Sequence, residues 1–441
     1  MIDGTPTGME GRVEAATVEA EMARLAGTRD ALLGRPVREI ARLLGRAGAR
    51  LGDAEDPLTR EAREVVAREA GYSTRMAGRV VAGMARDWSP DRLRELLLRE
   101  FDDPAVLDGW VPDARGGRRL RAMGDEVAVH LCSGSVPGVS TTSLVRSLLV
   151  KTPVLLKPGA GDRVLAAAFH EALAGEDADL AASASVLYWP GEDGACLEAA
   201  VSRARRVVVY GSDETAAAIR TATPVTTPVV AYHHRVSVAV VGTAAIDSPL
   251  LEDTADALSQ AVATFDQRGC VSPHRVFVLG SAETAGRLGD ALDVAMTREA
   301  GTAPPGPADP GEAARVQQLR SEVELRAAAG ETVRLWQGDG TSWTVVLDPE
   351  GGRVRGLPRT LVLVPVDARG LGEALAPLSA HLQTVGIAGL GPDGDEVVEG
   401  LIRLGVTRVV PVADMPFPPA WWHHDGAGPL RALVRWAEWE A

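Results

Sequence analysis

The part of the chain that begins near Val127 alternates short apolar segments with segments of helical period. VAVHLC, TPVLLK, SVLYW and RRVVVY are apolar almost throughout, and they alternate with SLVRSLLV, VLAAAFHEAL and ACLEAAVSRA. Apolar strands separated by helices of about 8 to 12 residues are typical of right-handed βαβ units in a parallel sheet that is covered on both faces. The pattern predicts an α/β fold, and such sheets bind ligands at the carboxyl ends of their strands.

Regions with other sequence patterns flank this block. Residues 12–101 carry apolar residues at spacings of three and four, which predicts a helical region packed on a larger body. A second α/β block begins near Thr243, and we expect its strands at RVFVLG, TVRLW, WTVVLD, TLVLVPV and QTVGIAG. Within that block, residues 300–314 (AGTAPPGPADPGEAA) are rich in proline, glycine and alanine, which favours a surface loop.

Composition disfavours several classes of protein. The 441 residues carry a formal net charge of −14, which argues against binding to nucleic acid or to an anionic membrane surface. No apolar run reaches the roughly 18 residues of a membrane span, and the N-terminus lacks the pattern of a secretory signal. The widely spaced Cys132, Cys196 and Cys270 suit neither a disulfide framework nor a recognisable zinc site. We therefore expect a cytoplasmic protein with no metal.

Cys270 is the cysteine with a candidate role in chemistry. It lies in FDQRGCVSP, between an expected helix and an expected strand, where Gly269 lets the backbone approach a ligand closely. An ordinary cysteine thiol has a pKa of about 8.5, so a nucleophile here needs local activation, for which Arg268 and His274 are the nearby candidates. Taken alone, such a cysteine is structural more often than catalytic.

Polar residues follow three expected strands of the first α/β block. SGSVPG holds Ser133 and Ser135, Lys157 precedes a Pro-Gly pair, and Gly211 with Ser212 opens a helix. A Gly-Ser pair at a helix N-terminus can bind phosphate, although the same residues often serve only as a helix cap. Lys157 likewise fits either a nucleotide ribose or a solvated strand end. None of these loops is the GxGxxG fingerprint of dinucleotide-binding domains.

The order of these signals resembles the aldehyde dehydrogenase superfamily. SGSVP, KPG and YGS after successive strands, then GC in a second α/β block, correspond to the superfamily's WNFP, KPS, TGS and nucleophilic cysteine. FDQRGCVSP, HLQTVGI and the ending HHDGAGPLRALVRWAEWE resemble more closely its LuxC-like fatty acyl-CoA reductase branch. The resemblance covers the chain from roughly Val127 to the C-terminus.

This resemblance implies an aldehyde dehydrogenase-like fold with four regions. Residues 1–120 would form a helical N-terminal region packed on the cofactor domain, and residues 121–242 a Rossmann-type NAD(P)-binding domain. Residues 243–415 would form a catalytic α/β domain with Cys270, and residues 416–441 a C-terminal segment. Because members of the superfamily are commonly dimers or tetramers, the resemblance also implies a homo-oligomer.

The reaction implied is the NADPH-dependent reduction of an acyl thioester, carried by CoA or by an acyl carrier protein, to an aldehyde. Cys270 would attack the carbonyl carbon and become acylated, and hydride transfer would then give a thiohemiacetal that collapses to the aldehyde. The cofactor contacts implied by position are Ser133, Lys157, Gly159, Gly191, Gly211, Ser212 and Thr215.

Three positions depart from the hydrolytic aldehyde dehydrogenases. YHHRVSV replaces a segment like ELGGKSP, so Tyr232 stands near the place of the glutamate base and water should attack an acyl-enzyme poorly. Ala160 stands where NAD-preferring relatives often have an acid. This favours NADPH, with NADH as the other possibility, because Lys157 or Arg163 can pair with a 2′-phosphate. Ser135 replaces the asparagine that stabilises the oxyanion, and it keeps one hydrogen-bond donor.

Other readings stay open at this point. His233 and His234 flank the missing base and are candidate proton donors, although paired histidines on a strand more often divide between core and surface. His424 and Asp425 fit an anchor for the C-terminal segment better than a catalytic role. For the whole chain, the alternatives are CoA-acylating aldehyde oxidation, and a non-catalytic acyl-binding subunit of a synthase complex, which the serine at position 135 keeps open.

Overall fold

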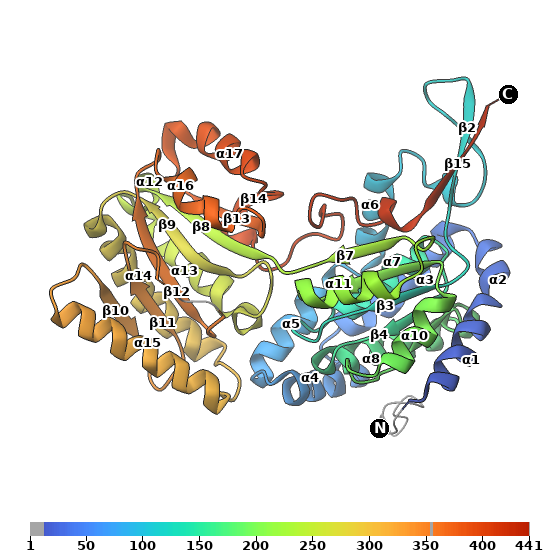
Figure 1. The fold of residues 1–441 in the computed structure, drawn as a ribbon, viewed down its shortest axis with the longest axis horizontal. Coiled ribbons are helices and arrows are strands. Elements are labelled where there is room, and N and C mark those ends of the chain that lie inside the picture. Colours follow the sequence, from blue (N-terminus) through green and yellow to red (C-terminus); the bar gives the residue numbers. More distant parts are fainter. Residues whose placement is uncertain (1–12, 353–355, 441) are drawn as a thin grey trace. The chain divides into compact units, whose positions relative to one another are not determined.

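The structure is a computed structural model that describes residues 13–352 and 356–440, and the chain forms two compact units (Figure 1). Unit 1 holds the described residues of Met1–Ala70, Val80–His233 and Pro419–Ala441, and unit 2 those of Gly71–Arg79 and His234–Pro418. The chain passes from unit 1 to unit 2 and back again within the region expected to be helical, because residues 71–79 belong to unit 2.

The N-terminal region is helical, as its apolar spacing predicts. Its helices are α1 (Ala15–Ala26), α2 (Arg29–Leu33), α3 (Val37–Gly52), α4 (Pro57–Ala70), α5 (Thr74–Arg86) and α6 (Pro90–Glu100). The residues at the repeating positions, such as Ile40 and Leu44 in α3, are fully buried. Ser89 precedes α6 in extended conformation, and Pro90 is its first helical residue, the position that proline favours. Helix α5 is the one that the boundary divides, since residues 74–79 belong to unit 2.

A five-stranded parallel sheet forms the centre of unit 1. Its order is β5-β4-β3-β6-β7, made of β3 (Ala128–Leu131), β4 (Val154–Lys157), β5 (Ala184–Val186), β6 (Arg206–Tyr210) and β7 (Val229–Tyr232). The strands β3, β5 and β6 are buried at every position, as expected for a sheet that helices cover on both faces. SVLYW is strand only as far as Val186, and Tyr188 and Trp189 belong to the loop that follows.

Helices cover the two faces of this sheet. Apolar residues of α1, α10 (Gly194–Arg203) and α11 (Asp213–Ala222) pack with alternate strand residues such as Val129 and Val207 in one buried cluster. On the other face, His130 Nδ1 and Ser143 Oγ of α7 (Val139–Leu149) lie 2.7 Å apart in a hydrogen bond. The remaining helices of this block are α8 (Arg163–Glu176) and α9 (Ala178–Ala181).

A three-stranded antiparallel sheet was not anticipated from the sequence. Strands β1 (Val111–Pro112), β2 (Arg118–Met123) and β15 (Arg435–Glu440) lie in the order β1-β2-β15, and β2 with β15 extends beyond the helices of unit 1 (Figure 1). The region expected to be helical therefore ends in strands, and the C-terminal segment ends in a strand. The pairing joins Arg118 to Glu440, residues too far apart in sequence for local patterns to link them.

Unit 2 is built on a seven-stranded sheet in the order β10-β11-β12-β9-β8-β13-β14. All neighbours are parallel except β10 with β11. The strands are β8 (Val236–Gly242), β9 (Pro273–Leu279), β10 (Arg334–Gln337), β11 (Thr344–Leu347), β12 (Thr360–Val366), β13 (Leu382–Ala388) and β14 (Arg408–Pro411). The helices are α12 (Thr243–Ile246), α13 (Leu250–Ala263), α14 (Ala282–Thr302), α15 (Pro310–Ala328), α16 (Leu371–Leu375) and α17 (Gly394–Arg403).

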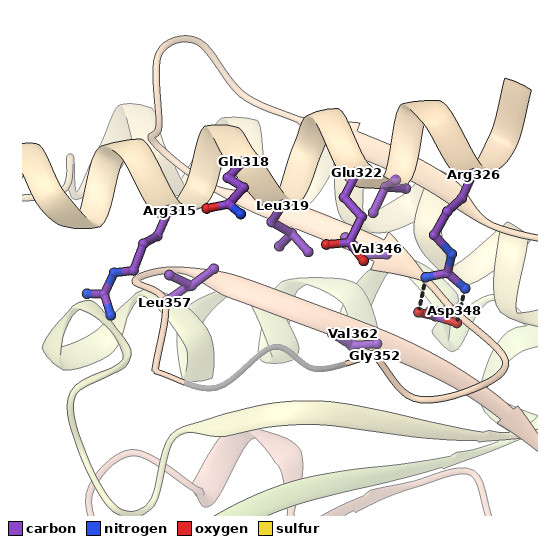
Figure 2. Close-up of a pocket in the computed structure, with 11 residues that line it drawn as sticks. Arg315, Gln318, Leu319, Glu322, Arg326, Val346, Asp348, Gly352, Leu357 and Val362 are labelled. Atoms are coloured by element: carbon purple, nitrogen blue, oxygen red, sulfur yellow. Dashed lines mark hydrogen bonds and ion pairs between the residues drawn. The ribbon is translucent and has the colours of Figure 1, made fainter.

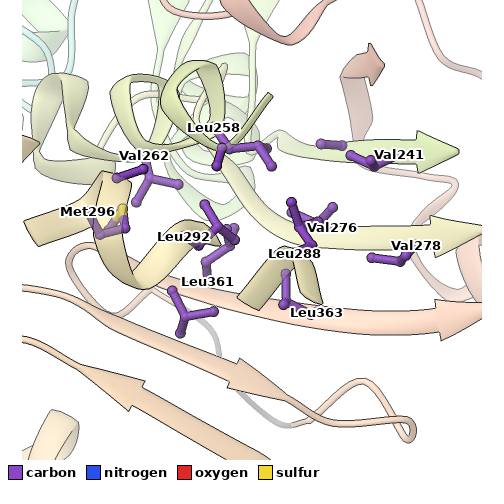
Figure 3. Packing of buried hydrophobic residues seen from close by; sticks show 14 of the residues in the cluster. Val241, Leu258, Val262, Val276, Val278, Leu288, Leu292, Met296, Leu361 and Leu363 are labelled. Carbon is purple, nitrogen blue, oxygen red and sulfur yellow. The ribbon is translucent and has the colours of Figure 1, made fainter. Parts of the chain in front are cut away.

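Buried clusters cover both faces of this sheet, and the one formed with α13 and α14 packs against β9. Leu258 of α13 and Leu288 and Leu292 of α14 point onto the strands, where they meet Val276 and Leu363 (Figure 3). These five side chains are completely buried, and burying each such side chain contributes roughly 1.5–3 kcal/mol. The two helices thus hold β9 rigidly, and the loop that carries Cys270 enters this strand.

The proline-rich stretch 300–314 is in part the surface loop that its composition predicts, and in part the ends of two helices. Its first residues end α14 and its last residues begin α15. Between the helices, Ala303 is buried, the carbonyl of Pro304 accepts a 2.6 Å hydrogen bond from Ser73 Oγ, and Gly306 is packed directly against the backbone of Gly71. Residues 307–311 are exposed, as the composition predicts, whereas Ala303 and Gly306 pack within unit 2.

Candidate active site

Cys270 lies in a short loop between α13 and β9 of unit 2, and its side chain is exposed, whereas Cys132 and Cys196 are buried. The turn that precedes it has an unusual backbone. Phe265, Asp266 and Gln267 have φ angles of 60°, 47° and 63°, in the left-handed region that non-glycine residues rarely adopt. Each such residue costs of order 1–3 kcal/mol, so the surrounding structure must hold the turn in place.

Side chains on both sides of the turn supply this restraint. Asp266 forms a buried ion pair with Arg359, and Arg359 Nε donates to its carboxylate at 2.8 Å. Gln267 Nε2 donates to the carbonyls of Pro273 and Thr360 at 2.7 and 2.8 Å, and its Oε1 accepts from Thr360 N at 2.6 Å. The turn before Cys270 is thereby tied to the start of β12 and to the start of β9.

The electrostatic surroundings of Cys270 differ from the expectation. Burial lowers the pKa of His274 to about 4, so this imidazole is neutral at pH 7 and supplies no positive charge to a thiolate. Arg268 is exposed, and its guanidinium lies 5.2 Å from the ring centre of Tyr72. A third cation, Arg408 at the start of β14, is the residue that sequence reasoning missed.

Arg408 is buried, and it is close enough to Cys270 for the two groups to interact electrostatically. Burial lowers the pKa of its guanidinium to about 10, which Asp414 and Cys270 oppose by favouring the charged form. Its two terminal nitrogens donate to the carbonyls of Met415 at 3.2 Å and Asp414 at 2.6 Å. Nothing in the local sequence marks an arginine at the start of a strand as a neighbour of a distant cysteine.

The sequence-predicted cofactor residues gather at one edge of the sheet in unit 1. Ser133 follows β3, Lys157 ends β4, and Gly191 lies in the loop after β5. Gly211 and Ser212 follow β6, and Ser212 Oγ accepts a 3.3 Å hydrogen bond from the Thr215 backbone as the N-cap of α11. Because these strands are parallel, all of these residues lie at the carboxyl edge.

Two of the loops at this edge interlock. A Cβ atom on Gly159 would come within 2.0 Å of the Gly134 backbone nitrogen, so only glycine fits there. The buried carboxylate of Asp162 accepts hydrogen bonds from the backbone nitrogens of Gly138 at 2.6 Å and Ser140 at 2.7 Å. Burial raises the pKa of Asp162 to about 7, and these hydrogen bonds oppose the rise. The exposed Ser135 is carried by the loop that this arrangement holds.

A cationic pair flanks Tyr188 at the same edge. Lys157 Nζ lies 5.6 Å and the Arg163 guanidinium 4.7 Å from the centre of the Tyr188 ring. Burial lowers the pKa of the Lys157 ammonium, while the nearby Cys132 and Glu192 favour its charged form. Lys157 is thus neither a simple solvated strand end nor a fully buried charge.

Tyr232 belongs to a column of stacked rings in unit 1. Its ring lies 4.5 Å from Tyr210 and 4.4 Å from His424, and His424 lies 4.4 Å from Trp422. Burial raises the pKa of Tyr232, so its hydroxyl is neutral at pH 7. The column joins the C-terminal segment to the ends of β6 and β7, in agreement with an anchoring role for His424.

The two candidate proton donors separate at the boundary between the units. His233 belongs to unit 1, where its Nδ1 lies 3.2 Å from the Asp213 carboxylate. His234 belongs to unit 2, where its ring lies 5.4 Å from that of His381.

A pocket in unit 2 lies between α15 and the sheet (Figure 2). It encloses about 210 Å³, with apolar side chains in the middle, Arg315 at one end, and Arg326 paired with Asp348 at the other. None of the residues that the sequence suggested for chemistry lines it. In residues 13–352 and 356–440, no helix combines the length and the apolar character needed to cross a membrane.

Comparisons with known proteins agree with this architecture. The family model described as acyl-CoA reductase (LuxC) matches residues 33–436. A long-chain acyl-protein thioester reductase from Aliivibrio fischeri is 26% identical over 389 residues, covering 84% of this chain and 75% of that protein. Long-chain acyl-protein thioester reductase 2 from Photobacterium leiognathi is 23% identical over 398 residues, with the same shares of 84% and 75%.

Two solved structures with the same fold are dehydrogenases at low sequence identity. The Δ-pyrroline-5-carboxylate dehydrogenase from Mycobacterium tuberculosis has a TM-score of 0.71 at 15% identity, covering 97% of this chain and 83% of that one. The NAD-dependent benzaldehyde dehydrogenase from Corynebacterium glutamicum has a TM-score of 0.70 at 14% identity, covering 97% and 91%. The fold is therefore aldehyde dehydrogenase-like, and the chain belongs to the LuxC family of acyl-CoA reductases.

Proposed function

We propose that this chain reduces an acyl thioester to an aldehyde with NADPH, through an acyl-enzyme on Cys270. The observation that carries the proposal is the exposed thiol of Cys270 beside a strained turn, in a chain whose other two cysteines are buried. The similarity to long-chain acyl-protein thioester reductases supports a thioester as the substrate class, with CoA or an acyl carrier protein as donor.

In this proposal, unit 1 binds the cofactor and unit 2 carries the nucleophile. The carboxyl edge of the parallel sheet in unit 1 fits a dinucleotide, because α11 directs its N-terminus there and Gly191 has open space where a side chain would lie. Gly211, Ser212 and Thr215 would hold the pyrophosphate and adenine side, and Lys157 the ribose. Ser133 and Gly159 would complete the edge. The bound nicotinamide would supply a hydride.

The chemistry at Cys270 is acyl transfer followed by reduction. The sulfur of Cys270 forms a bond to the thioester carbonyl carbon, the bond from that carbon to the carrier sulfur breaks, and the carrier leaves as a thiol after taking up a proton. Reduction of the acyl-enzyme gives a thiohemiacetal on Cys270, which collapses to aldehyde and the regenerated thiolate. The hydroxyl of Ser135 and the backbone amide of Cys270 are the donors that we assign to the oxyanion.

Tyr232, which stands near the place of the glutamate base, disfavours hydrolysis of the acyl-enzyme. A positioned base accelerates attack by water about 10²–10⁴-fold. Tyr232 stands near the place of that base, and burial raises its pKa, so it cannot accept a proton at pH 7. An acyl-enzyme on Cys270 should therefore persist long enough to be reduced or to return to a carrier thiol.

NADPH is the cofactor that the cations at the sheet edge favour. Arg163 and Lys157 lie over the same tyrosine ring, and Ala160 is exposed where an acid would repel a 2′-phosphate. Glu192 acts in the opposite direction, since its carboxylate is near Lys157. Arg163 also pairs with Glu69 at 3.3 Å, so each of the two cations has one acid beside it. The absence of an acid at position 160 makes NADPH the cofactor that we favour and leaves NADH as a weaker one.

We also propose that the chain acts as a homo-oligomer in the cytoplasm. Trp110, Trp436 and Trp439, on and beside the three-stranded sheet, are 39%, 38% and 45% exposed. Large exposed apolar side chains that gather in one region of the surface often mark a protein–protein interface. Three thiols without a disulfide suit a reducing compartment.

Incubation of the purified protein with NADPH and either acyl-CoA or acyl carrier protein thioesters tests the proposal. We expect aldehyde formation with equal NADPH consumption, an acyl adduct on Cys270 by intact-mass spectrometry, and loss of both in Cys270→Ala. Faster turnover with aldehyde, NAD and a thiol would favour CoA-acylating oxidation instead. Cofactor binding without turnover, unaffected by Cys270→Ala, would favour a non-catalytic subunit.

A further inference from the structure

The turn before Cys270 has a strained backbone that several side-chain contacts hold in place. Three consecutive non-glycine residues in the left-handed region are rare, and such strain persists only where several contacts determine it together. Strained segments of this kind cluster at sites that need a fixed geometry.

Asp266 is fixed by charge. Its Oδ1 lies 2.8 Å from Arg359 Nε and 2.7 Å from Arg359 Nη2, and its Oδ2 accepts a 3.2 Å hydrogen bond from Gly306 N. The side chains of Asp266 and Arg359 are only 4% and 2% exposed. Removing one partner of such a buried pair leaves an uncompensated charge in the interior, which is strongly unfavourable, so the pair restrains the residue at position 266.

Gln267 is fixed by neutral hydrogen bonds. Its amide nitrogen donates to the carbonyls of Pro273 and Thr360, and its amide oxygen accepts from Thr360 N. Like Asp266, it is almost completely buried. The adjacent Phe265 is fixed separately, because its ring meets Phe417 edge to face at 5.2 Å between centroids.

We propose that Asp266 and Gln267 are positioning residues, which act through Arg359 and Thr360 to hold the left-handed turn and thereby present the Cys270 thiol to substrate. We call the contacts of Asp266 with Arg359 and of Gln267 with Thr360 the clamp. If the clamp is lost, residues 265–267 relax toward right-handed conformations, and the orientation of the residues that follow changes with them. This inference rests on the proposed function, in which Cys270 is the nucleophile. It makes the clamp a determinant of the reactivity of Cys270 rather than of stability alone.

A second buried aspartate in unit 2 provides a matched control. Asp348 is 3% exposed and pairs with Arg326 at 2.8 Å, at the end of the pocket under α15 (Figure 2). Asp348→Asn therefore removes a buried carboxylate from an arginine, as Asp266→Asn does. The arginine in this pair, Arg326, is 23% exposed and also pairs with Glu331 at 2.7 Å. Only Asp266 belongs to the turn before Cys270. Asparagine also tolerates the left-handed region, so the change at position 266 isolates the loss of the ion pair.

The test is the rate of Cys270 alkylation by iodoacetamide at pH 7, located by peptide mass spectrometry in the full-length protein, together with kcat and KM for an acyl thioester. We expect Asp266→Asn and Gln267→Met to slow alkylation of Cys270 and to lower kcat at least fivefold, with KM nearly unchanged. Asp348→Asn should leave both rates within twofold of the unaltered protein.

The buried cysteines report whether each variant is folded, because Cys132 and Cys196 become alkylated only when the structure opens. If Asp266→Asn unfolds through the charge it leaves on Arg359, the double variant Asp266→Asn/Arg359→Met removes that charge as well. It should fold and still show the slow alkylation. Its matched control is Asp348→Asn/Arg326→Met.

The outcomes separate this inference from the proposed function. Alkylation of Cys270 within twofold of the unaltered protein in folded Asp266→Asn and Gln267→Met would overturn the positioning role, whatever the enzyme turns over. Slow alkylation in both variants, in a protein that makes no aldehyde from any thioester, would support positioning and overturn the proposed function.

Discussion

Ser237 Oγ, at the start of β8, donates a 2.6 Å hydrogen bond to the backbone carbonyl of Cys270. The hydroxyl belongs to the segment YHHRVSV, and it reaches a loop that follows 33 residues later in the chain. Ser237 is completely buried. This bond fixes the carbonyl of the proposed nucleophile from the side opposite to the clamp formed by Arg359 and Thr360.

Ser237→Ala should lower kcat about fivefold and leave KM nearly unchanged, because one net hydrogen bond of about 1 kcal/mol no longer orients Cys270. Steady-state kinetics with an acyl thioester would measure the effect. Ser272→Ala is the matched control, since Ser272 Oγ is buried nearby with no hydrogen-bond partner in the described part of the chain. Equal effects of the two changes would argue that Ser237 acts only through packing.

Arg408→Gln should slow the alkylation of Cys270 at pH 7 about fivefold. The guanidinium and Cys270 interact electrostatically, and a nearby positive charge favours the reactive thiolate. Arg408→Lys keeps the charge but loses part of the hydrogen bonding to the carbonyls of Asp414 and Met415, so it should stay within twofold of the unaltered protein. If lysine and glutamine slow the reaction equally, the contribution is structural and not electrostatic.

The buried carboxyl of Asp162 should make the protein less stable as pH rises toward neutrality. Burial raises its pKa from 3.8 to about 7, so the folded state binds more protons than the unfolded state between these values. The free energy of unfolding from this group therefore falls from about pH 4 to pH 7, by at most about 1.4 kcal/mol per pH unit.

Asp162→Asn removes this titration, and its unfolding midpoint in urea should show a weaker decline between pH 5 and pH 7 than that of the unaltered protein. It should also raise KM for NADPH, because asparagine accepts poorly from the backbone nitrogens of both Gly138 and Ser140. If the unfolding midpoints of the two proteins decline equally with pH, the raised pKa of Asp162 is contradicted.

Arg163→Ala should raise KM for NADPH about tenfold and KM for NADH less than twofold. A charge-assisted bond to a 2′-phosphate contributes roughly 1.5–3 kcal/mol, and NADH has no such phosphate. Arg205→Ala provides the comparison, because Arg205 is an exposed arginine beside the amino end of β6, away from the carboxyl edge. A similar rise in KM for both cofactors would place Arg163 outside the 2′-phosphate contact.

The alternating apolar pattern alone predicted the α/β architecture, and the structure confirms it. The VVVY segment of β6 is apolar at every position because helices cover both faces of a parallel sheet. Such a run of neighbouring apolar residues can be recognised in the sequence alone. The helical N-terminal region and the family follow from the same kind of local information, since both depend on spacing or on short motifs. The catalytic role of Cys270 and the cofactor contacts stay predictions.

Tertiary structure decided what joins residues far apart in the chain. The pairing of Arg118 with Glu440, the clamp from Thr360 onto Gln267, and the approach of Arg408 to Cys270 each link segments that have no shared local pattern. The neutrality of His274 likewise follows from burial, which no short segment specifies. A sequence determines which residues are apolar and where a chain can turn, whereas the charge and reactivity of a side chain depend on the neighbours that folding brings to it.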